Sequence, residues 1–537
     1  MKPVRRETLP ALVAEEIKRD IFHGSFKSGD KLPPENELRR VLGVGRPTLR
    51  EALRILEGQG WINFKLGEGA YVMDSSKMSQ ITSSFIKKEE ITELLEYELI
   101  QLEQEGKILK SEKEDLERLK KKTSLAELER FYDDLLDLDE RTDFHYVEPS
   151  EIELIQRKPF KKKSLSQIPE NNLLYERIYG AWLGRSIGCL LGKPVEGWTK
   201  EQIEKYLKST NSYPLQDYFL YEPERVSNGD FSFHPSAKEA TKSNIEYMPR
   251  DDDMDYTILN LKIIQENGFD FTTEDIGEEW LLSLPYKQVY TAERQAYANL
   301  VMGIKPPGTA IFRNPFREWV GAQIRGDIFG YISPGNPDLA ASMAYKDASF
   351  SHTKNGIYGE IFVAAAISTA LVSDDLKKVI RAGLSNVPKR SRLFQVVKNV
   401  LDWSENLNSW EEVRHKVGIY YGNYHWVHVL PNLAYVLIGL IWGQLDFRKT
   451  VSIAVMCGGD TDCNGATAGS IIGAINGYAC IPQEMSEPLN DKIRSFVPGY
   501  SETKISYLAK ETYRLVLEHK AYVVKLEMEG INKKKKF

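Results

Sequence analysis

The chain has 537 residues, a length that predicts about two to four domains. With 42% hydrophobic and 28% charged residues, it has the composition of an ordinary globular protein. Its net charge of -6 excludes a basic, nucleic-acid-binding surface over the whole chain, though not over one domain. The four cysteines form no C-x-x-C pair and no Cys/His spacing that suits zinc, which indicates free thiols in a reducing compartment. No segment is apolar enough to cross a bilayer and the N-terminus is charged, so we expect a cytoplasmic protein.

Residues 1–74 are expected to form a compact first unit. Hydrophobic spacing and turn residues predict a helix through Val13, Ile17 and Ile21, helices over 35–42 and 47–59, and strands over 61–64 and 70–72 around a glycine turn. Two short helices joined by a tight turn and followed by a two-stranded wing are typical of a winged helix-turn-helix.

The second helix of that motif begins with residues suited to DNA. Arg46, Arg50 and Arg54 share one of its faces, and arginine binds both guanine edges and phosphates. The residues expected to pack inward from the other face are Leu49, Leu53 and Leu56. The pattern predicts a recognition helix that lies in the major groove.

The sequences LPPENEL at 32–38 and LGVGRPTLREAL at 42–53 resemble the GntR family of bacterial regulators. The resemblance implies that Arg46, Thr48 and Arg50 contact double-stranded operator DNA and that the wing turn at Gly67 enters the minor groove. Relatives often have Arg where this chain has Asn36, so one contact of the family is in doubt. The alternative interpretation is a winged helix that serves only as a protein-interaction module.

Residues 75–170 are expected to form a charged helical linker followed by an irregular connector. The stretch 86–136 is rich in Glu, Lys and Leu, which predicts long amphipathic helices that could supply a homodimer contact. The basic run 161–163 has the composition of a solvated linker. At the other end of the chain, residues 521–537 are expected to be a basic tail.

Residues 171–520 are expected to form a large, all-α domain. Two segments have a glycine every four residues: Gly180, Gly184, Gly188 and Gly192, and then Gly465, Gly469, Gly473 and Gly477. This spacing puts each set on one helical face, and each glycine costs about 1 kcal/mol relative to alanine. Because close helix–helix approach would offset that cost, we expect the two helices to cross with no side chains between them. The charges of Arg185, Lys193, Asp460 and Asp462 exclude a membrane interpretation.

Two acidic segments stand at predicted helix starts. The first holds Asp251, Asp252, Asp253 and Asp255; the second holds Asp460 and Asp462. A helix N-terminus favours each acid by only about 0.3–1 kcal/mol, so carboxylates this close repel one another unless a cation neutralises them. Alone, the first segment could equally be a solvated acidic cap. Together, the two predict a two-metal site for hard ions such as Mg²⁺ or Mn²⁺.

The segments that carry these features resemble the ADP-ribosylglycohydrolase family, over roughly residues 172–518. The matching motifs are GAWLG at 180–184, GKPVEG at 192–197, the aspartates at 251–253, SHT at 351–353, His428 with Asn432, and GGDTD at 458–462. The resemblance implies an all-α domain with two Mg²⁺ ions, Mn²⁺ being possible, that bind a ribose. It also implies an enzyme that cleaves the bond between ADP-ribose and an acceptor.

The resemblance assigns roles to individual residues. It places Asp251, Asp252 and Asp253 in a first metal cluster, and Asp460 and Asp462 in a second. Glu196 matches a glutamate of the family's active-site loop, and we expect it to act as catalytic acid or base, with Asp252 behind it. The positions that match the ligand cleft are Arg325, His352, His428 and Asn432, although each could equally be a satisfied interior polar group.

Two departures leave the activity open. Relatives often have Thr where this chain has Asp251 and Cys463, and a thiol is a poor Mg²⁺ ligand. One hypothesis is a DNA-binding transcription regulator whose large domain hydrolyses an ADP-ribosyl or related ribosyl bond. The other is a domain without turnover that senses a ribose-bearing ligand for a repressor.

Overall fold

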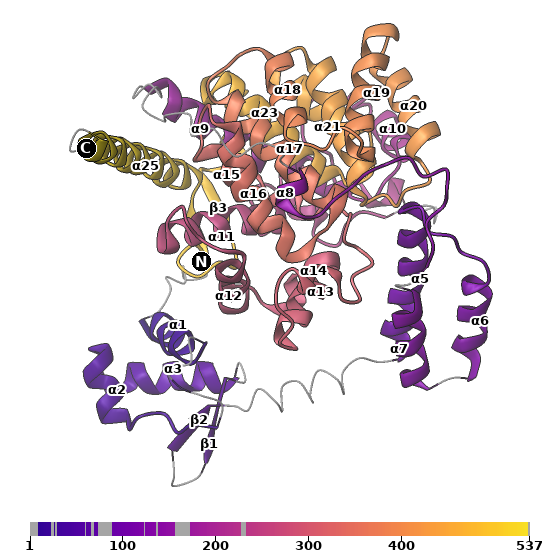
Figure 1. Ribbon diagram of the computed structural model, residues 1–537. Coiled ribbons are helices and arrows are strands. Elements are labelled where there is room, and N and C mark those ends of the chain that lie inside the picture. Colours follow the sequence, from indigo (N-terminus) through magenta and orange to yellow (C-terminus); the bar gives the residue numbers. More distant parts are fainter. Residues whose placement is uncertain are drawn as a thin grey trace.

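The computed structural model describes residues 9–22, 26, 29–58, 61–65, 69–72, 88–122, 124–135, 138–155, 172–226 and 232–534. Three parts follow one another along the chain (Figure 1). They are an N-terminal unit up to residue 72, a linker bundle from residue 88 to 135, and a large domain from residue 172 onward. A strap, residues 138–155, runs from the linker bundle over the large domain.

The N-terminal unit has the predicted helix-turn-helix and wing. Its elements are α1 (Leu9–Phe22), α2 (Glu35–Leu42), α3 (Arg46–Gly58), β1 (Ile62–Lys65) and β2 (Gly69–Val72). The two strands are antiparallel, with Ile62 opposite Val72. As expected, the inward face of α3 is buried through Leu49, Leu53 and Leu56. Gly24 and the wing residue Gly67 lie outside the described residues.

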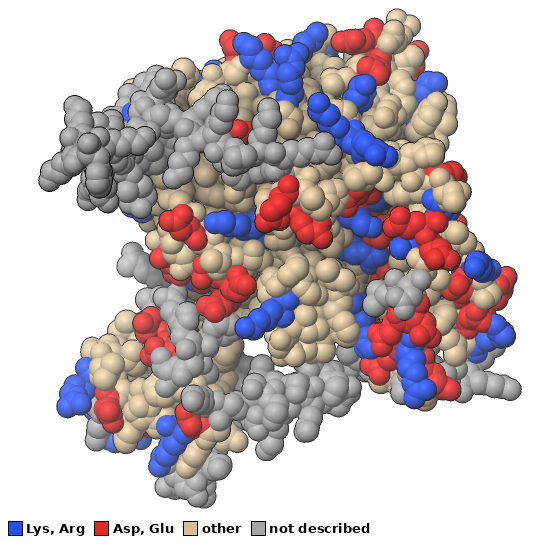
Figure 2. Space-filling view, viewed as in Figure 1, with Lys and Arg blue, Asp and Glu red and all other residues tan. Residues whose placement is uncertain are grey.

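The linker bundle is helical and charged, as the sequence predicts, but it consists of three helices of 17, 11 and 10 residues and not of long ones throughout. They are α5 (Lys88–Gln104), α6 (Glu112–Lys122) and α7 (Leu125–Asp134). Their apolar faces meet in a small core of their own that includes Leu95, Leu99, Leu116 and Leu128. Their outer surface carries charges of both signs (Figure 2), paired in part as Lys113–Glu103 and Lys120–Glu96. The bundle is therefore a folded unit, and its exposed faces are highly charged.

A second face of α5 is docked on the large domain through charged groups. Glu98 and Glu105 are both buried, and they accept from the Arg317 guanidinium at 3.0 and 2.8 Å. Lys354 donates to Glu105 at 2.7 Å. Beside these pairs, Tyr97 packs edge-on against Trp319, with ring centroids 5.6 Å apart. The sequence did not predict this docking.

The strap is irregular in conformation, as expected for a connector, but it is firmly attached. Glu148 accepts from the buried Arg392 guanidinium, and Asn355 donates to the same carboxylate at 2.8 Å. The backbone N–H of Val147 donates to the carbonyl of Arg390 at 3.0 Å. The short helix α8 (Ile152–Ile155) ends the described part of the connector, and the basic run at 161–163 lies outside it.

The large domain is helical, with one small antiparallel strand pair, β3 (Lys492–Arg494) and β4 (Glu502–Lys504). Its helices are α9 (Asn172–Gly192), α10 (Lys200–Ser209), α11 (Asp252–Asn267), α12 (Thr273–Ser283), α13 (Thr291–Val301), α14 (Gly308–Ile311), α15 (Asp327–Tyr331), α16 (Pro337–Ser351), α17 (Lys354–Ala370), α18 (Leu376–Ser385), α19 (Arg392–Asn406), α20 (Trp410–Tyr421), α21 (Val429–Gly443), α22 (Phe447–Met456), α23 (Thr461–Asn476), α24 (Gln483–Ser486) and α25 (Ile505–Lys534). One continuous apolar core joins them.

Helices α9 and α23 form the centre of this domain and lie antiparallel in direct backbone contact. A Cβ atom on Gly188 would stand 1.9 Å from the carbonyl oxygen of Gly465, and one on Gly184 would stand 2.2 Å from that of Gly469. No side chain fits there, which confirms the expected glycine-faced crossing. Gly477 differs from the others, because it ends α23 with φ of +79°, and a Cβ atom on it would meet α9 only at 3.6 Å, although its own backbone lies against Gly180.

Helix α25 continues the domain to Lys534, through most of the segment expected to be a basic tail. It is anchored near its start, where Thr512 accepts from the indole N–H of the buried Trp182 at 3.0 Å. Among the described residues, no helix has the length and apolarity needed to cross a membrane.

Candidate active site

The glycine crossing brings the loop after α9 to the start of α23. Gly192 faces Thr461, whose hydroxyl donates to the Gly192 carbonyl at 2.8 Å. Beyond that point the N–H of Gly197 donates to the carbonyl of Gly459 at 3.0 Å. Gly458 and Gly459 both have φ near +80°, at +79° and +78°, a conformation that favours glycine. Glu196 and the two acids Asp460 and Asp462 are therefore held side by side.

Arg185 brings the start of α11 to the same place. This side chain on α9 is fully buried, and its Nη2 donates to the carbonyl of Asp253 at 2.6 Å and to the Asp253 carboxylate at 3.2 Å. Its Nη1 lies 2.9 Å from the carboxylate of Asp327. From the sequence, Arg185 is predicted only as a charge that excludes a membrane helix. Its position on a buried, glycine-faced helix was the available signal for a structural role.

Lys193 is a second basic residue of the site, and its role there is not predicted from the sequence. Its side chain is 8% exposed and its ammonium group donates to the carboxylate of Asp251, which is 1% exposed. Asp251 also caps α11 by accepting from the N–H of Asp253 at 3.0 Å. The acid at this position is therefore both a helix cap and the partner of a buried lysine.

The structure brings five of the predicted acids together in what we call the acid cluster: Glu196, Asp251, Asp253, Asp460 and Asp462. Among the described residues, three groups have ligand atoms within 4.8 Å of one another: Glu196 with Asp460 and Asp462; Asp253 with Asp462 and Cys463; and Asp251 with Asp253 and Cys189. The first group offers only carboxylate oxygens, whereas each of the others includes a thiol. Asp252 belongs to none of these groups, although it borders the cluster.

The electrostatics of the acid cluster fit a bound cation. Burial raises the pKa of Asp460 well above its usual value, and the Asp462 and Glu196 carboxylates add to the effect. Burial and then Asp462 likewise raise the pKa of Glu196. For Asp252, burial and Asp251 raise the pKa to about 7. Asp251 is the only acid of the cluster whose pKa is lowered, because the positive charge of Lys193 outweighs the effect of burial. The remaining acids need added positive charge to be ionised together at neutral pH.

Two of the predicted ligand-cleft residues lie in a separate buried network. Arg325 is fully buried and pairs with Glu293 at 2.7 Å and with Asp347. Its Nη2 also donates to the Ser351 hydroxyl at 2.9 Å, and His352 Nδ1 lies 2.9 Å from the same hydroxyl. The described contacts of Arg325 and His352 are structural, and their contact with a ligand stays a prediction.

The other two predicted cleft residues support the acid cluster from α21. The Asn432 side chain accepts from the N–H of Asp460 at 3.1 Å and donates to the carbonyls of His428 at 2.9 Å and Trp426 at 2.7 Å. His428 Nδ1 accepts from the N–H of Leu430 at 3.2 Å, and its Nε2 lies 3.8 Å from Glu318. Asn432 thus fixes the turn that presents Asp460, and ligand contact by either residue stays a prediction.

On the N-terminal unit, the predicted DNA contacts lie at the exposed start of α3. Arg46 and Arg50 are each 57% exposed and share one carboxylate partner, Glu35, at 3.2 and 3.1 Å. Thr48 lies between them and is half-buried. The single acid holds both guanidinium groups close together, and both remain exposed to solvent.

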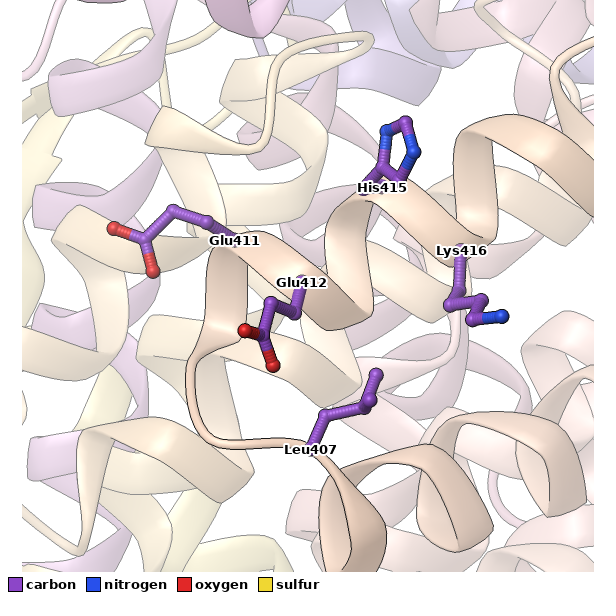
Figure 3. Close-up of a pocket in the computed structure, with 5 residues that line it drawn as sticks. All are labelled: Leu407, Glu411, Glu412, His415 and Lys416. Carbon is purple, nitrogen blue, oxygen red and sulfur yellow. The ribbon is translucent and has the colours of Figure 1, made fainter.

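A hollow of about 350 Å³ on α20 is unrelated to these sites. Leu407, Glu411, Glu412, His415 and Lys416 line it. Figure 3 shows that its charged side chains diverge, with Glu411 and Lys416 pointing in opposite directions. The hollow is shallow and contains none of the predicted site residues, so it provides no second site.

Comparisons with known proteins agree with both halves of this description. The bacterial regulatory proteins of the gntR family match residues 11–72. Over this part the chain is 41% identical to the HTH-type transcriptional repressor NanR of Klebsiella aerogenes across 71 residues, which are 13% of this chain and 27% of that protein. It is 45% identical to the uncharacterized HTH-type transcriptional regulator YcbG of Bacillus subtilis across 75 residues, which are 14% of this chain and 32% of that protein. The chain therefore spans about a third or less of the length of these relatives.

The rest of the chain matches a different family. The ADP-ribosylglycohydrolase family matches residues 170–520. Among solved structures, an ADP-ribosylglycohydrolase-related protein complex aligns with a TM-score of 0.41 and 20% identity, over 64% of this chain and 100% of that chain. The chain thus belongs to the ADP-ribosylglycohydrolase family, and it carries a GntR-type DNA-binding domain at its N-terminus.

Proposed function

We propose that the large domain is a divalent-metal-dependent glycohydrolase that cleaves an ADP-ribosyl or related ribosyl bond, and that the N-terminal unit makes the protein a transcription regulator. The observation that carries the enzymatic half is the all-carboxylate group of Glu196, Asp460 and Asp462, with ligand atoms within 4.8 Å of one another. Mg²⁺ and Mn²⁺ prefer such oxygen ligands.

In this proposal the residues of the chain divide the chemistry between them. A bound divalent ion would polarise a water and orient the ribose hydroxyls. Asp460 and Asp462 would hold that ion at the start of α23, where Asn432 accepts from the N–H of Asp460 and keeps it in place. Glu196 is the most exposed acid of the cluster, with 27% of its side chain accessible. It is therefore the residue placed to give a proton to the leaving group or to take one from water. Asp252, at the border of the cluster, is the second candidate for this role.

The test of the enzymatic proposal is a turnover assay with Mg²⁺ on ADP-ribosylated proteins and ADP-ribosyl small molecules. Glu196→Gln should lower turnover by about 100-fold or more, because a general acid or base typically contributes 10²–10⁴-fold. Since the Gln amide keeps one oxygen ligand, this variant should weaken metal binding less than the loss of Asp460 and Asp462 does. Asp460→Asn with Asp462→Asn should abolish metal binding in calorimetry. Metal binding without turnover on any of these substrates would refute the proposed enzymatic activity but not the proposed metal site.

For the N-terminal unit we propose a homodimer on a pseudo-palindromic operator, since one helix-turn-helix reads only a half-site. Arg46, Thr48 and Arg50 would contact the DNA from α3, and Gly67 from the wing. Arg50→Ala should lose about 1–3 kcal/mol of discrimination at one base pair per half-site. Arg118→Ala removes an equally charged, exposed side chain from α6 and should leave discrimination unchanged. A monomeric protein, or equal affinity of the native chain for random duplex, would contradict this proposal.

A second function, ligand sensing without turnover, is supported by the contacts of α5. Gln101 on this helix donates to Glu318 at 2.8 Å, and Glu318 lies 3.8 Å from His428 Nε2. His428 in turn is bonded through its carbonyl to Asn432, which holds Asp460. The linker bundle and the acid cluster are thus joined by contiguous polar contacts, through which a ligand could act on the DNA-binding unit.

A further inference from the structure

The acid cluster contains its own cation. The Lys193 ammonium group is buried and contacts Asp251, one of the acids expected to bind metal. The backbone fixes this arrangement, because Lys193 directly follows Gly192, which is packed against Thr461 at the start of α23. The lysine is therefore held where it is by the closest helix contact of the domain.

The basic side chains divide the cluster into two halves. Lys193 neutralises Asp251, and Arg185 pairs with Asp253 at 3.2 Å. Both acids that α11 gives to the cluster thus contact a basic side chain, although Arg185 is shared between Asp253 and Asp327. On the α23 side, Asp460 and Asp462 have no Lys or Arg within ion-pair distance in the described part of the chain, and Glu196 has only His234, at 3.6 Å. A direct contact with Lys or Arg is therefore lacking on the α23 side, which Lys193 reaches only at longer range.

Ligand chemistry gives the same division. The two ligand groups that include Asp253 each contain a thiol, from Cys189 or Cys463. A neutral, soft thiol is a poor ligand for Mg²⁺, which prefers several carboxylate and water oxygens. The group of Glu196, Asp460 and Asp462 alone is made entirely of oxygen ligands. Charge and ligand type therefore select the same side of the cluster.

We infer that this chain binds one divalent ion, at Glu196, Asp460 and Asp462, and that the Lys193 ammonium stands in place of a second ion beside Asp251. The inference rests on the proposed metal-dependent function and deepens it, and it replaces the two ions expected from the sequence by one. Lys193 is a positioning residue here, because it fixes Asp251 and its charge without touching the reacting atoms.

Mn²⁺ is the probe for the test, since it is paramagnetic and accepts the same oxygen ligands. The full-length native chain should bind one Mn²⁺ in calorimetry and give the paramagnetic resonance spectrum of an isolated ion. Lys193→Met keeps the length of the side chain and removes its charge, so a second Mn²⁺ should bind to Asp251 and Asp253 and give the spectrum of a coupled pair. Because a thiol is among the neighbouring ligand groups, this second ion should bind more weakly than the first. Lys262→Met is the matched control, because Lys262 is also in a buried pair, with Glu279 at 2.6 Å, and should still bind one ion.

Two further variants test the inference if Lys193→Met does not fold. Asp460→Asn should bind no ion, whereas Asp251→Asn should still bind one, since only the first removes a ligand of the single ion. Two ions in the native chain, one ion in a folded Lys193→Met, or loss of the ion in Asp251→Asn would each overturn the inference and leave the proposed metal-dependent function standing. A native chain that binds no Mn²⁺ would overturn both.

Discussion

The contact between α9 and α23 and the contact between α5 and the large domain both bury a helix against the same body, but with opposite chemistry. In the first, the backbones touch, and a Cβ atom on Gly188 would stand 1.9 Å from Gly465. In the second, buried ion pairs such as those of Arg317 with Glu98 and Glu105 lie beside the aromatic contact of Tyr97 with Trp319. The first contact excludes both side chains and water, whereas every charged group of the second would gain hydration on separation.

The difference indicates which contact is permanent. Separating α9 from α23 would expose apolar surface and leave nothing to replace the close packing. Separating α5 exchanges ion pairs for hydrated charges, and a buried ion pair often contributes little net stability because desolvation opposes it. We expect the glycine contact to fix the acid cluster. We call the charged contact between α5 and the large domain the joint, because we expect the DNA-binding unit to respond to the large domain through it.

The largest expected effect comes from removing one charge of the joint. Arg317→Met leaves Glu98 and Glu105 buried without their main partner, which should destabilise the docked linker by about 3–5 kcal/mol. Hydrogen exchange of the α5 amides measures this directly. Arg313→Met is the control in the same interface, since its pair with Glu129 is more exposed and should contribute at most about 1 kcal/mol. Equal effects of the two variants would mean that burial of the charges does not govern the joint.

Acid should open the joint in the native chain. Burial alone would raise the pKa of Glu105, but Arg317 and Lys354 outweigh it and lower the pKa from 4.5 to about 2. Because the pKa is depressed in the docked state, its stabilisation is complete above about pH 4.5 and is lost as the pH falls toward 2. At about 1.4 kcal/mol per pH unit, the loss approaches about 3 kcal/mol.

The acid cluster should respond to pH with the opposite sign. The pKa of Asp252 is raised to about 7 in the folded state, so its contribution to stability is greatest at low pH and falls as the pH rises through 7. Hydrogen exchange between pH 5 and pH 3, corrected for the intrinsic rates, should therefore show faster opening of α5 than of α11. Equal changes in the exchange rates of α5 and α11 would contradict the opposite pH dependence expected for the two regions.

A methyl group should be enough to disturb the glycine contact. Gly188→Ala forces the backbones of α9 and α23 apart, and overpacking of this kind typically costs about 1–3 kcal/mol. The measurement is the urea midpoint of the large domain. Gly418→Ala is the control, because that exposed glycine of α20 would meet only the flexible end of Arg414 and should gain up to about 1 kcal/mol of helix propensity. A stable Gly188→Ala domain would show that the helices can separate after all.

The smallest expected effect is the coupling between ligand binding at the acid cluster and DNA binding by the N-terminal unit. Mg²⁺ with ADP-ribose should change operator affinity by about fivefold or more, the lower end of usual coupling energies, at fixed salt. Asp460→Asn should bind the operator with an affinity that Mg²⁺ and ADP-ribose do not change. Gln101→Leu removes the hydrogen bond from α5 to Glu318 and should reduce the change in operator affinity. A change below about twofold in the native chain would mean that the two halves are only neighbours.

Local patterns in the sequence predicted much of this fold and site. Helix α2 begins and ends at the expected residues, and the four-residue glycine spacing predicted the crossing of α9 and α23. The two acidic motifs at helix starts predicted most of the acid cluster. In each case neighbours a few residues apart carry the signal, through helical periodicity or capping.

The features that the sequence did not predict depend on pairs far apart in the chain. Glu98 and Arg317 are separated by 219 residues, and a buried glutamate on an amphipathic helix has the same local pattern as a solvated one. Lys193 was visible as a charge in an apolar region, but its partner Asp251 is 58 residues away. Arg325 matched a ligand-cleft position, and only the fold shows that its guanidinium is enclosed by Glu293 and Asp347.

The backbone contact of α9 and α23 also limits how this protein can evolve. Gly180, Gly184, Gly188 and Gly192 meet their partners in a fixed register that ends where Glu196 faces Asp460 and Asp462. Inserting one residue into α9 would rotate the glycines off the contact by about 100°. Inserting four would restore the face but shift Glu196 by about 6 Å along the helix, away from its partners. The length of the segment from Gly180 to Glu196 is therefore fixed, and natural insertions in related proteins should fall outside it.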